Sequence, residues 1–324
     1  MCTAVTFKTE CFYFGRNLDL ERSYNECVTV TPRNFFFQFR NGMALPQHYA
    51  MIGMATVRDG YPLYYEATNE VGLSMCGLNF PDNAFYHPWR DGYENIAPFE
   101  LIPWILGQCS SVLEASSKLS AMNLWDKAFH EHFALTPLHW LLADSKHAIV
   151  IEPLKNGLSI CDDPIGILTN NPPFDYHMHH LAQYMNLTPR PPVNRFASEI
   201  PIKPYSLGMG SIGLPGDPSS ASRFVRAAFT KYNSACDSSN DASLNQFFHI
   251  LRSVAQYRGL TNLGNNQFEI TRYSSCCNTN TGVYYYTTYG NSQIHAIDMH
   301  REDLNGSTLS TFMLSNTENI HFQN

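Results

Sequence analysis

Charged side chains are scarce in this sequence: they make up 15% of its 324 residues, against about 25% in typical soluble domains. The 21 Lys and Arg residues are scattered, and the formal net charge is −7. A surface that binds nucleic acid needs a basic stripe, and the sequence contains none. We therefore expect no nucleic-acid partner. Hydrophobic residues, at 44%, suffice for the full core that a chain of this length buries.

Paired cysteines and long apolar runs are also missing. The nine cysteines contain no C-x-x-C pair, which argues against a structural zinc site, and many unpaired thiols indicate a reducing compartment. The first twenty residues lack the basic start and apolar run of a signal peptide. No apolar stretch reaches the ~18 residues of a membrane span. We expect a cytoplasmic protein with no membrane association.

Two further patterns could suggest a metal or a cofactor. The G-x-G-x-x-G match at 208–213 is flanked by prolines, so it lacks the strand and helix of a dinucleotide site. Five histidines could suggest a metal site: His130, His132, His177, His179 and His180. The last three fall on a helix predicted over 174–185 and lack an acidic partner at ligand spacing. We interpret that histidine group as a solvated helix face and expect neither metal nor cofactor.

Short strands gather in three groups, separated by helices. Strands are predicted at 3–8, 11–14, 28–30, 35–39, 49–57, 63–79, 139–144, 148–151, 158–161, 165–168, and within 268–297. Helices are predicted at 111–119, 174–185 and 222–232, and over an apolar stripe that follows Asp241 as N-cap. Grouped strands without βαβ alternation indicate an α+β fold of antiparallel sheets packed with helices. Residues 1–324 form one domain in this interpretation.

Cys2 is the first candidate for chemistry, because it follows Met1. A small residue at this position permits removal of the initiator methionine, which leaves Cys2 at the N-terminus. Such a cysteine carries a thiol nucleophile and an α-amine of pKa about 7.7–8.0, so the amine can serve as the base. A cysteine at this position without any function is the alternative.

Arg16 and Asp19 follow the first predicted hairpin. If the strand at 3–8 pairs with the strand at 11–15, the chain returns to its own start, and both side chains come close to Cys2. A guanidinium there favours the thiolate, and a carboxylate can orient the amine. A surface salt bridge at a strand end is the alternative for this pair.

The opening MCT and the segment FGRNLD at 14–19 resemble the choloylglycine hydrolase family, which includes bile salt hydrolases and penicillin V acylases. Further matches follow in order along the whole chain: EATNEVGLSMCGLNFP at 66–81, TPLHW at 136–140, IGILTNNP at 165–172, GLPGD at 213–217, ASRFVRAAF at 221–229, and YYYTTY at 284–289. The resemblance implies an N-terminal-nucleophile hydrolase with an αββα sandwich.

The resemblance also implies roles for six residues. The nucleophile is Cys2 and its supporting pair is Arg16 and Asp19; the remaining family positions match Asn79, Asn170 and Arg223. Amide hydrolysis passes through an oxyanion, for which Asn side chains are suitable donors. Asn171 stands where relatives usually carry Ser, and the preceding Leu-Thr pair selects Asn170. Substrate contacts are expected from Arg16 and Asn79, and Asn79 favours the bile-salt branch over penicillin-preferring relatives with Tyr.

The resulting hypothesis is hydrolysis of the amide bond of glycine- or taurine-conjugated bile acids through a Cys2 thioester. The alternative enzyme is an acylase of penicillin V or of another N-acyl amide. A non-catalytic steroid-binding scaffold is the alternative from a different class. The family resemblance further implies a homo-oligomer, expected to be a homotetramer.

Overall fold

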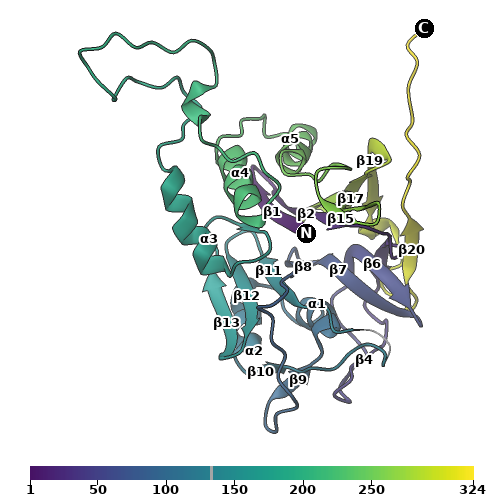
Figure 1. Cartoon of the computed structure of the whole chain (residues 1–324). Helices are drawn as coiled ribbons and strands as arrows, with labels where there is room; N and C mark the ends of the chain where they lie inside the picture. Colours follow the sequence, from purple (N-terminus) through teal and green to yellow (C-terminus); the bar gives the residue numbers. More distant parts are fainter. Residues whose placement is uncertain (132–133) are drawn as a thin grey trace.

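Two antiparallel sheets form the centre of the computed structural model, which describes residues 1–131 and 134–324. The six-stranded sheet has the order β14 (Ile167–Leu168), β1 (Cys2–Lys8), β2 (Phe12–Leu20), β17 (Ile270–Asn278), β18 (Val283–Thr288), β19 (Asn291–Asp298). The eight-stranded sheet has the order β13 (Gly157–Asp162), β12 (Ala148–Leu154), β11 (Leu138–Ala143), β8 (Ser74–Asn79), β7 (Tyr61–Asn69), β6 (Met51–Arg58), β3 (Cys27–Thr31), β20 (Ser310–Met313). The two sheets face each other (Figure 1).

Helices cover the outer face of each sheet. They are α1 (Leu101–Leu106), α2 (Val112–Leu119), α3 (Phe174–Leu181), α4 (Ser220–Tyr232) and α5 (Asn240–Arg252). Helices α4 and α5 contact β1, β2 and β17, whereas α1 packs on β7 and β8 on the far side of the molecule (Figure 1). The layers are therefore α, β, β, α, which confirms the predicted sandwich.

Small elements complete the connections between the layers. Two-stranded pairs are β4 (Phe37–Gln38) with β5 (Ala44–Leu45), β9 (Glu94–Ile96) with β10 (Met122–Leu124), and β15 (Asn262–Gly264) with β16 (Gln267–Phe268). Single 3₁₀ turns are η1 (Pro98–Glu100), η2 (Ala182–Tyr184), η3 (Met209–Ser211) and η4 (Met299–Arg301). Among the described residues, no helix is both long enough and apolar enough to cross a bilayer.

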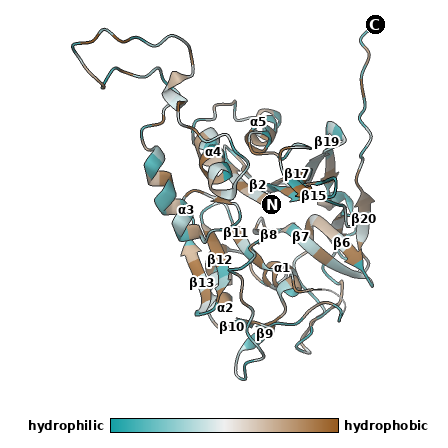
Figure 2. Cartoon of the chain, viewed as in Figure 1, coloured by the Kyte–Doolittle hydropathy of each residue, from teal (hydrophilic) through white to brown (hydrophobic). Residues whose placement is uncertain are grey.

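Side chains that alternate in direction along the strands form two hydrophobic cores, one between the sheets and one under α1 and α2. In β11, Leu141 and Ala143 belong to the core that includes β1 and β2, whereas Trp140 and Leu142 belong to the core under α1 and α2. Successive side chains of a strand point to opposite faces, so a strand between two covered faces is hydrophobic along its whole length. Figure 2 shows these strands with long hydrophobic stretches.

The first hairpin fixes the start of the chain. Strands β1 and β2 pair antiparallel, with Cys2 opposite Leu18 and Ala4 opposite Arg16, as predicted. However, β2 extends beyond the predicted strand to Leu20, because it also pairs with β17 on its other side. Arg16 and Asp19 are consequently buried strand residues and not a surface pair at a strand end.

Several predicted elements differ in detail from the structure. The strand predicted at 35–39 is reduced to β4, and α1 was not predicted because its six residues, including Pro103, are too few for helical periodicity. The N-cap of α5 is Ser239, which accepts from the backbone N–H of Ala242, and not Asp241. Asp241 instead lies in the first turn, where a carboxylate also favours the helix dipole.

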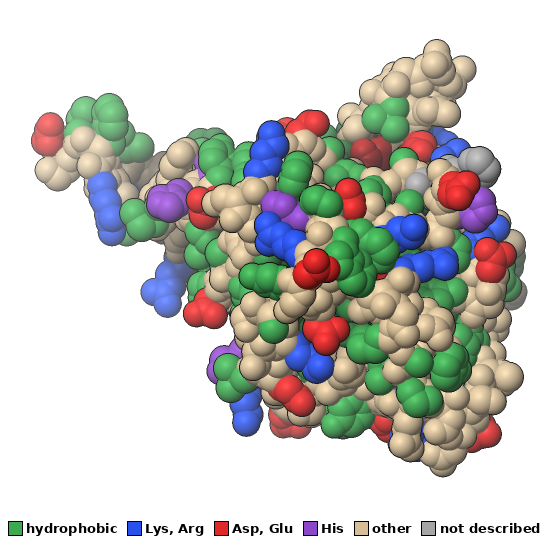
Figure 3. Space-filling model, turned by 90° about the horizontal axis from the view of Figure 1, so that it is seen from below, with side chains coloured by type: hydrophobic (Ala, Val, Ile, Leu, Met, Phe, Trp, Pro, Cys, Tyr) green, Lys and Arg blue, Asp and Glu red, His purple; other side chains and the backbone are tan. Residues whose placement is uncertain are grey.

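Residues 185–217 project from the body as an arm between α3 and α4 (Figure 1). Large apolar side chains are exposed on the arm: Met185, Val193, Phe196, Tyr205 and Leu207 are each at least 77% accessible. Figure 3 shows hydrophobic side chains gathered on the outer part of this projection. Exposed apolar side chains gathered together are typical of interaction surfaces.

Asp163 makes the stability of the turn before β14 sensitive to pH. Its carboxylate accepts the backbone N–H groups of Ile165, Gly166 and Ile167 at 2.8–3.0 Å, and burial raises its pKa to about 6. The pKa of an Asp side chain in the unfolded chain is about 3.9, so the folded chain binds this proton more readily. The contribution of Asp163 to the free energy of unfolding therefore grows by up to about 3 kcal/mol as the pH falls from about 6 to about 4.

The variant Asp163→Asn removes this titration. Urea denaturation of both proteins between about pH 4 and pH 7 measures the difference in their free energies of unfolding. The contributions of the other carboxylates are the same in both proteins and cancel in this difference. We expect the wild type to become more stable relative to the variant as the pH falls. A difference that does not change with pH would contradict the assignment.

Candidate active site

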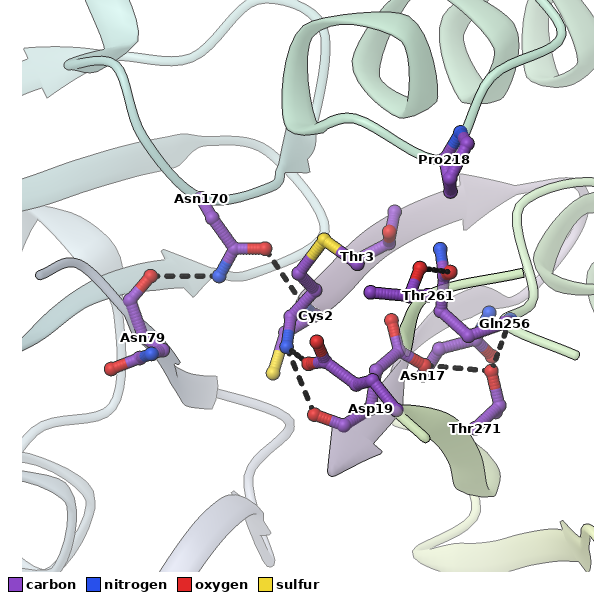
Figure 4. A network of polar contacts seen from close by, with 12 residues as sticks. Cys2, Thr3, Asn17, Asp19, Asn79, Asn170, Pro218, Gln256, Thr261 and Thr271 are labelled. Atoms are coloured by element: carbon purple, nitrogen blue, oxygen red, sulfur yellow. Dashed lines mark hydrogen bonds and ion pairs between the residues drawn. The ribbon is translucent and has the colours of Figure 1, made fainter. Parts of the chain in front are cut away.

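Cys2 opens β1 and is 3% exposed. Its backbone nitrogen donates a hydrogen bond to Asn170 Oδ1 at 2.8 Å. The contact joins residues 168 positions apart in the sequence, because β14, which leads into Asn170, lies beside β1 in the same sheet. After removal of Met1 this nitrogen would be the α-amine, and Asn170 would be its acceptor (Figure 4).

Asn170 also connects Cys2 to Asn79 across the two sheets. Its Nδ2 donates to the Asn79 backbone oxygen at 2.7 Å (Figure 4). Asn79 ends β8, and its side chain is exposed and makes no hydrogen bond to the described residues. Asn171, in contrast, donates to the Pro81 oxygen at 2.5 Å. The two adjacent asparagines therefore serve different partners, and only Asn170 reaches Cys2.

Arg223 holds the same network from the first turn of α4. Its Nη2 donates to Asn170 Oδ1 at 2.7 Å, and its Nη1 donates to Thr3 Oγ1 at 2.6 Å and to the Cys2 carbonyl oxygen. The guanidinium is fully buried. One side chain thus fixes both the backbone of Cys2 and the amide that accepts from its nitrogen.

Arg16 approaches Cys2 from β2 and spans the gap between the sheets. Its Nη1 donates to the carbonyl oxygens of Gly77 at 2.5 Å and Tyr65 at 3.2 Å, on strands β8 and β7. Its Nη2 is buried without a partner within the described residues. Burial acts to lower the pKa of Arg16 and of Arg223, and the nearby Cys2 acts to raise both.

Asp19 supplies the negative charge of the site. One carboxylate oxygen accepts from Thr271 Oγ1 at 2.6 Å, and the other is buried without a partner within the described residues. Burial raises the pKa of Asp19, although Arg223 and the terminal ammonium oppose that rise. The Met1 ammonium donates to the Asp19 backbone oxygen at 3.0 Å and pairs with Glu269. The Asp19 N–H in turn donates to the Met1 carbonyl oxygen at 3.0 Å, so Asp19 lies beside the peptide bond whose cleavage would expose the Cys2 nitrogen.

Two buried histidines hold the segment that presents Asn170. His139 Nε2 contacts the Thr169 oxygen at 2.9 Å while its Nδ1 contacts Glu152 at 3.1 Å, and His177 Nε2 donates to the Asn170 oxygen at 2.9 Å. The prediction of a solvated histidine face was therefore wrong for His177, which is 0% exposed. It lies on the face of α3 that stacks on Phe224, and periodicity alone does not reveal a polar residue on the buried face.

We predict that His177→Phe lowers kcat about tenfold, because it keeps the ring but leaves the Asn170 carbonyl without its donor. A buried polar group without a partner costs about 1–3 kcal/mol, and small displacements near the reacting atoms are costly in rate. His179→Phe is the matched control, since His179 is exposed on the same helix. Equal kcat in both variants would contradict the positioning role.

The described residues contain no group of three His, Cys, Asp or Glu side chains arranged to hold a metal ion. His132 lies outside the described residues. The groups around Cys2 instead suit covalent catalysis: a thiol, two guanidiniums, a carboxylate and amide donors. A cysteine at the start of the first strand of an αββα sandwich defines the class of N-terminal-nucleophile hydrolases.

Comparison with known proteins identifies the family. The profile of the choloylglycine hydrolase family of linear amide C–N hydrolases matches residues 2–312. The chain is 50% identical over 314 residues to the bile salt hydrolase/transferase of Lactiplantibacillus plantarum, with 97% of each covered, and 37% identical to that of Clostridium perfringens over the full length of both. This chain belongs to the choloylglycine hydrolase family.

Solved structures agree with this assignment. A cysteine-to-alanine variant of the conjugated bile acid hydrolase from Clostridium perfringens superimposes with a TM-score of 0.93 at 37% identity, with full coverage of both chains. Penicillin V acylase from Agrobacterium tumefaciens shares the fold, with a TM-score of 0.75 at 20% identity. The superposition covers 96% of this chain and 90% of the acylase.

Proposed function

We propose that this enzyme hydrolyses conjugated bile salts at the amide bond between the bile acid and glycine or taurine. The supporting observation is the full-length similarity to proteins named bile salt hydrolase/transferase, at 50% and 37% identity. The geometry around Cys2 agrees, since amide cleavage needs a nucleophile, a nearby base and oxyanion donors.

In the proposed reaction, Met1 is first removed and the Cys2 amine takes the proton of its own thiol. The thiolate attacks the amide carbon, and the C–N bond then breaks as the amine returns that proton to the leaving glycine or taurine nitrogen. The product of this half-reaction is a thioester on Cys2. Water, deprotonated by the same amine, attacks the thioester carbon. The C–S bond then breaks, the free bile acid leaves, and the amine returns the proton to the Cys2 sulfur.

Asn79 and Asn170 are the proposed oxyanion donors. Asn170 Nδ2 gives one N–H to the Asn79 carbonyl, which leaves its second N–H available, and the Asn79 side chain is not engaged within the described residues. Asn170, which is held in place before the reaction, can stabilise the charge that develops on the substrate oxygen, and the Asn79 side chain is free to turn toward the same oxygen. Arg16 and Asn79 are proposed as substrate contacts, and for Arg16 the group without a partner is Nη2.

A comparison of kcat/KM for taurocholate, glycocholate and penicillin V tests the proposal. We expect a clear preference for the two bile salts. Preference for penicillin V would support the acylase alternative, for which the 20% identical structure shows only a shared fold. Binding of bile salts without turnover by a chain that has lost Met1 would support the steroid-binding scaffold.

Acyl transfer is a second candidate activity, because the relatives at 50% and 37% identity are named hydrolase/transferase. The same Cys2 thioester would react with a free amine in place of water. Incubation of glycocholate with excess taurine, followed by mass spectrometry, tests this activity. Formation of taurocholate is the expected result, and hydrolysis alone would contradict it.

We further propose a cytoplasmic homotetramer. The exposed apolar side chains of the arm, such as Phe196 and Leu207 at 88% and 93% accessibility, support burial against another copy. Nine free cysteines are consistent with a reducing compartment. Light scattering tests the assembly. We expect the wild type to have the mass of four copies, and the double variant Phe196→Ser/Leu207→Ser to form a smaller species. A monomeric wild type would contradict the proposal.

A further inference from the structure

Glu66 is a buried carboxylate between the two sheets that the reaction outlined above does not use. It lies on β7 and is 2% exposed. Its Oε1 accepts from Tyr284 at 2.5 Å and from Ser275 at 3.0 Å, and its Oε2 accepts from Tyr273 at 2.7 Å. These three hydroxyl donors come from β17 and β18 of the opposite sheet. Such a complete set of donors stabilises an ionised group in the interior.

The positive partner of Glu66 is Arg16. Arg16 Nε lies 3.9 Å from Glu66 Oε2, and both side chains are buried. The remaining contacts of this guanidinium are carbonyl oxygens, of Gly77 and Tyr65 through Nη1 and of Asn17 through Nε. Carbonyl oxygens orient a guanidinium but carry no net charge to balance it. Glu66 is therefore the carboxylate within ion-pair distance of Arg16 in the described structure.

We propose that Glu66 is a positioning residue, which holds the Arg16 guanidinium in place and balances its charge, and thereby sets the electrostatic environment of Cys2. This inference rests on the proposed function of Cys2 as nucleophile. Without Glu66, the uncompensated guanidinium, still held by the Gly77 and Tyr65 carbonyls, would favour the Cys2 thiolate more strongly, and its remaining nitrogen would lose its fixed orientation. Glu66 acts through Arg16, and no contact with the substrate is required.

The burial of Glu66 indicates that its charge has a role other than stability. A carboxylate without solvent is costly, and hydrophobic replacements of buried ion pairs are often neutral or stabilising. Burial raises the pKa of Glu66, while Arg16, Tyr284, Tyr273 and Ser275 oppose that rise. The titratable and charged groups facing this pair from the surrounding strands are Cys2, Cys76, Tyr65, Asp19, Tyr273 and Tyr284.

The experiment measures the pH dependence of Cys2 alkylation by iodoacetamide, followed on the N-terminal peptide by mass spectrometry. Glu66→Gln keeps the side-chain volume and removes the charge. We expect the alkylation midpoint to fall by about one pH unit, because Arg16 stays on its carbonyls without a balancing charge. We expect kcat/KM for glycocholate to fall at least about tenfold, because Arg16 Nη2, the proposed substrate contact, is no longer held in orientation. Glu66→Asp retains the charge and is expected to return the midpoint to within about 0.3 unit of the wild type.

Tyr284→Phe is the second variant, for the case that Glu66→Gln does not fold. Loss of this hydroxyl removes one of the donors that stabilise the ionised Glu66, so a shift of up to about 0.5 unit in the same direction is expected. Tyr285→Phe is the matched control, because successive strand side chains point to opposite faces. Exposed Cys236 provides an internal reference in each sample.

An unchanged midpoint in Glu66→Gln, or in Tyr284→Phe if only that variant folds, would overturn the inference. Loss of stability without a shift would overturn it equally, since it indicates a purely structural carboxylate. Alkylation does not require a substrate. A shifted midpoint in a protein that cleaves no bile salt would therefore contradict the proposed function and leave the Glu66 assignment intact.

Discussion

Replacement of Cys2 by alanine is expected to lower kcat/KM for glycocholate by at least about 10⁴-fold, which is the scale of loss when a catalytic nucleophile is removed. The thiol sulfur forms the covalent bond to the substrate in the proposed reaction, so no neighbouring group can replace it. The variant keeps the backbone atoms held by Asn170 and Arg223. Substrate should therefore still bind to the inactive protein with a Kd close to the wild-type value.

Cys109→Ala is the matched control for this change. Cys109 is fully buried in the core under α1 and α2, which lies on the far side of the eight-stranded sheet from Cys2. We expect this variant to lose stability through the small cavity that it creates and to keep its kcat. A Cys2→Ala variant that turns over glycocholate at more than a few per cent of the wild-type rate would contradict the nucleophile assignment.

Asn170→Ala is expected to reduce kcat by about 10²–10³-fold, with a smaller change in KM. The scale is that of a lost oxyanion donor. The structure adds two further reasons for a large effect. The substitution removes the acceptor of the Cys2 nitrogen, and it leaves Arg223 Nη2 without its partner. Steady-state kinetics on glycocholate measure both parameters.

Asn171→Ala separates this effect from a general disturbance of the loop. Asn171 is the adjacent asparagine, and its side chain contacts the Pro81 oxygen and not Cys2. We expect its kcat to stay within about threefold of the wild type, since a single hydrogen bond away from the reacting atoms contributes about 1 kcal/mol or less. A larger loss in Asn171→Ala than in Asn170→Ala would mean that the roles of the two asparagines are exchanged.

Much of the fold could be predicted from local patterns. The pairing of 3–8 with the next strand, the helix starting near 111, and the grouped antiparallel strands all depend on residues close together in the sequence. The family motifs then implied the sandwich. The limits of β2 were less predictable, because β17, more than 250 residues away, extends its pairing through Asp19.

The site shows the same division between local and distant information. The neighbourhood of Cys2 and Arg16 follows from one hairpin. The contacts of His177 and Glu66 do not, because their partners lie on other elements and each looks like an ordinary polar residue in the sequence. A buried polar group is visible only when its donors and acceptors are brought together by the tertiary fold.

The most direct test of the account concerns the two functional groups on Cys2. The purified chain is treated with 2-cyanobenzothiazole, which condenses with a thiol and an amine on the same residue, and intact mass is compared with glycocholate turnover. We expect the unlabelled chain to lack Met1, and turnover to fall in proportion to the labelled fraction. Full turnover by a chain that retains Met1, or by a fully labelled chain, would contradict catalysis by an N-terminal cysteine.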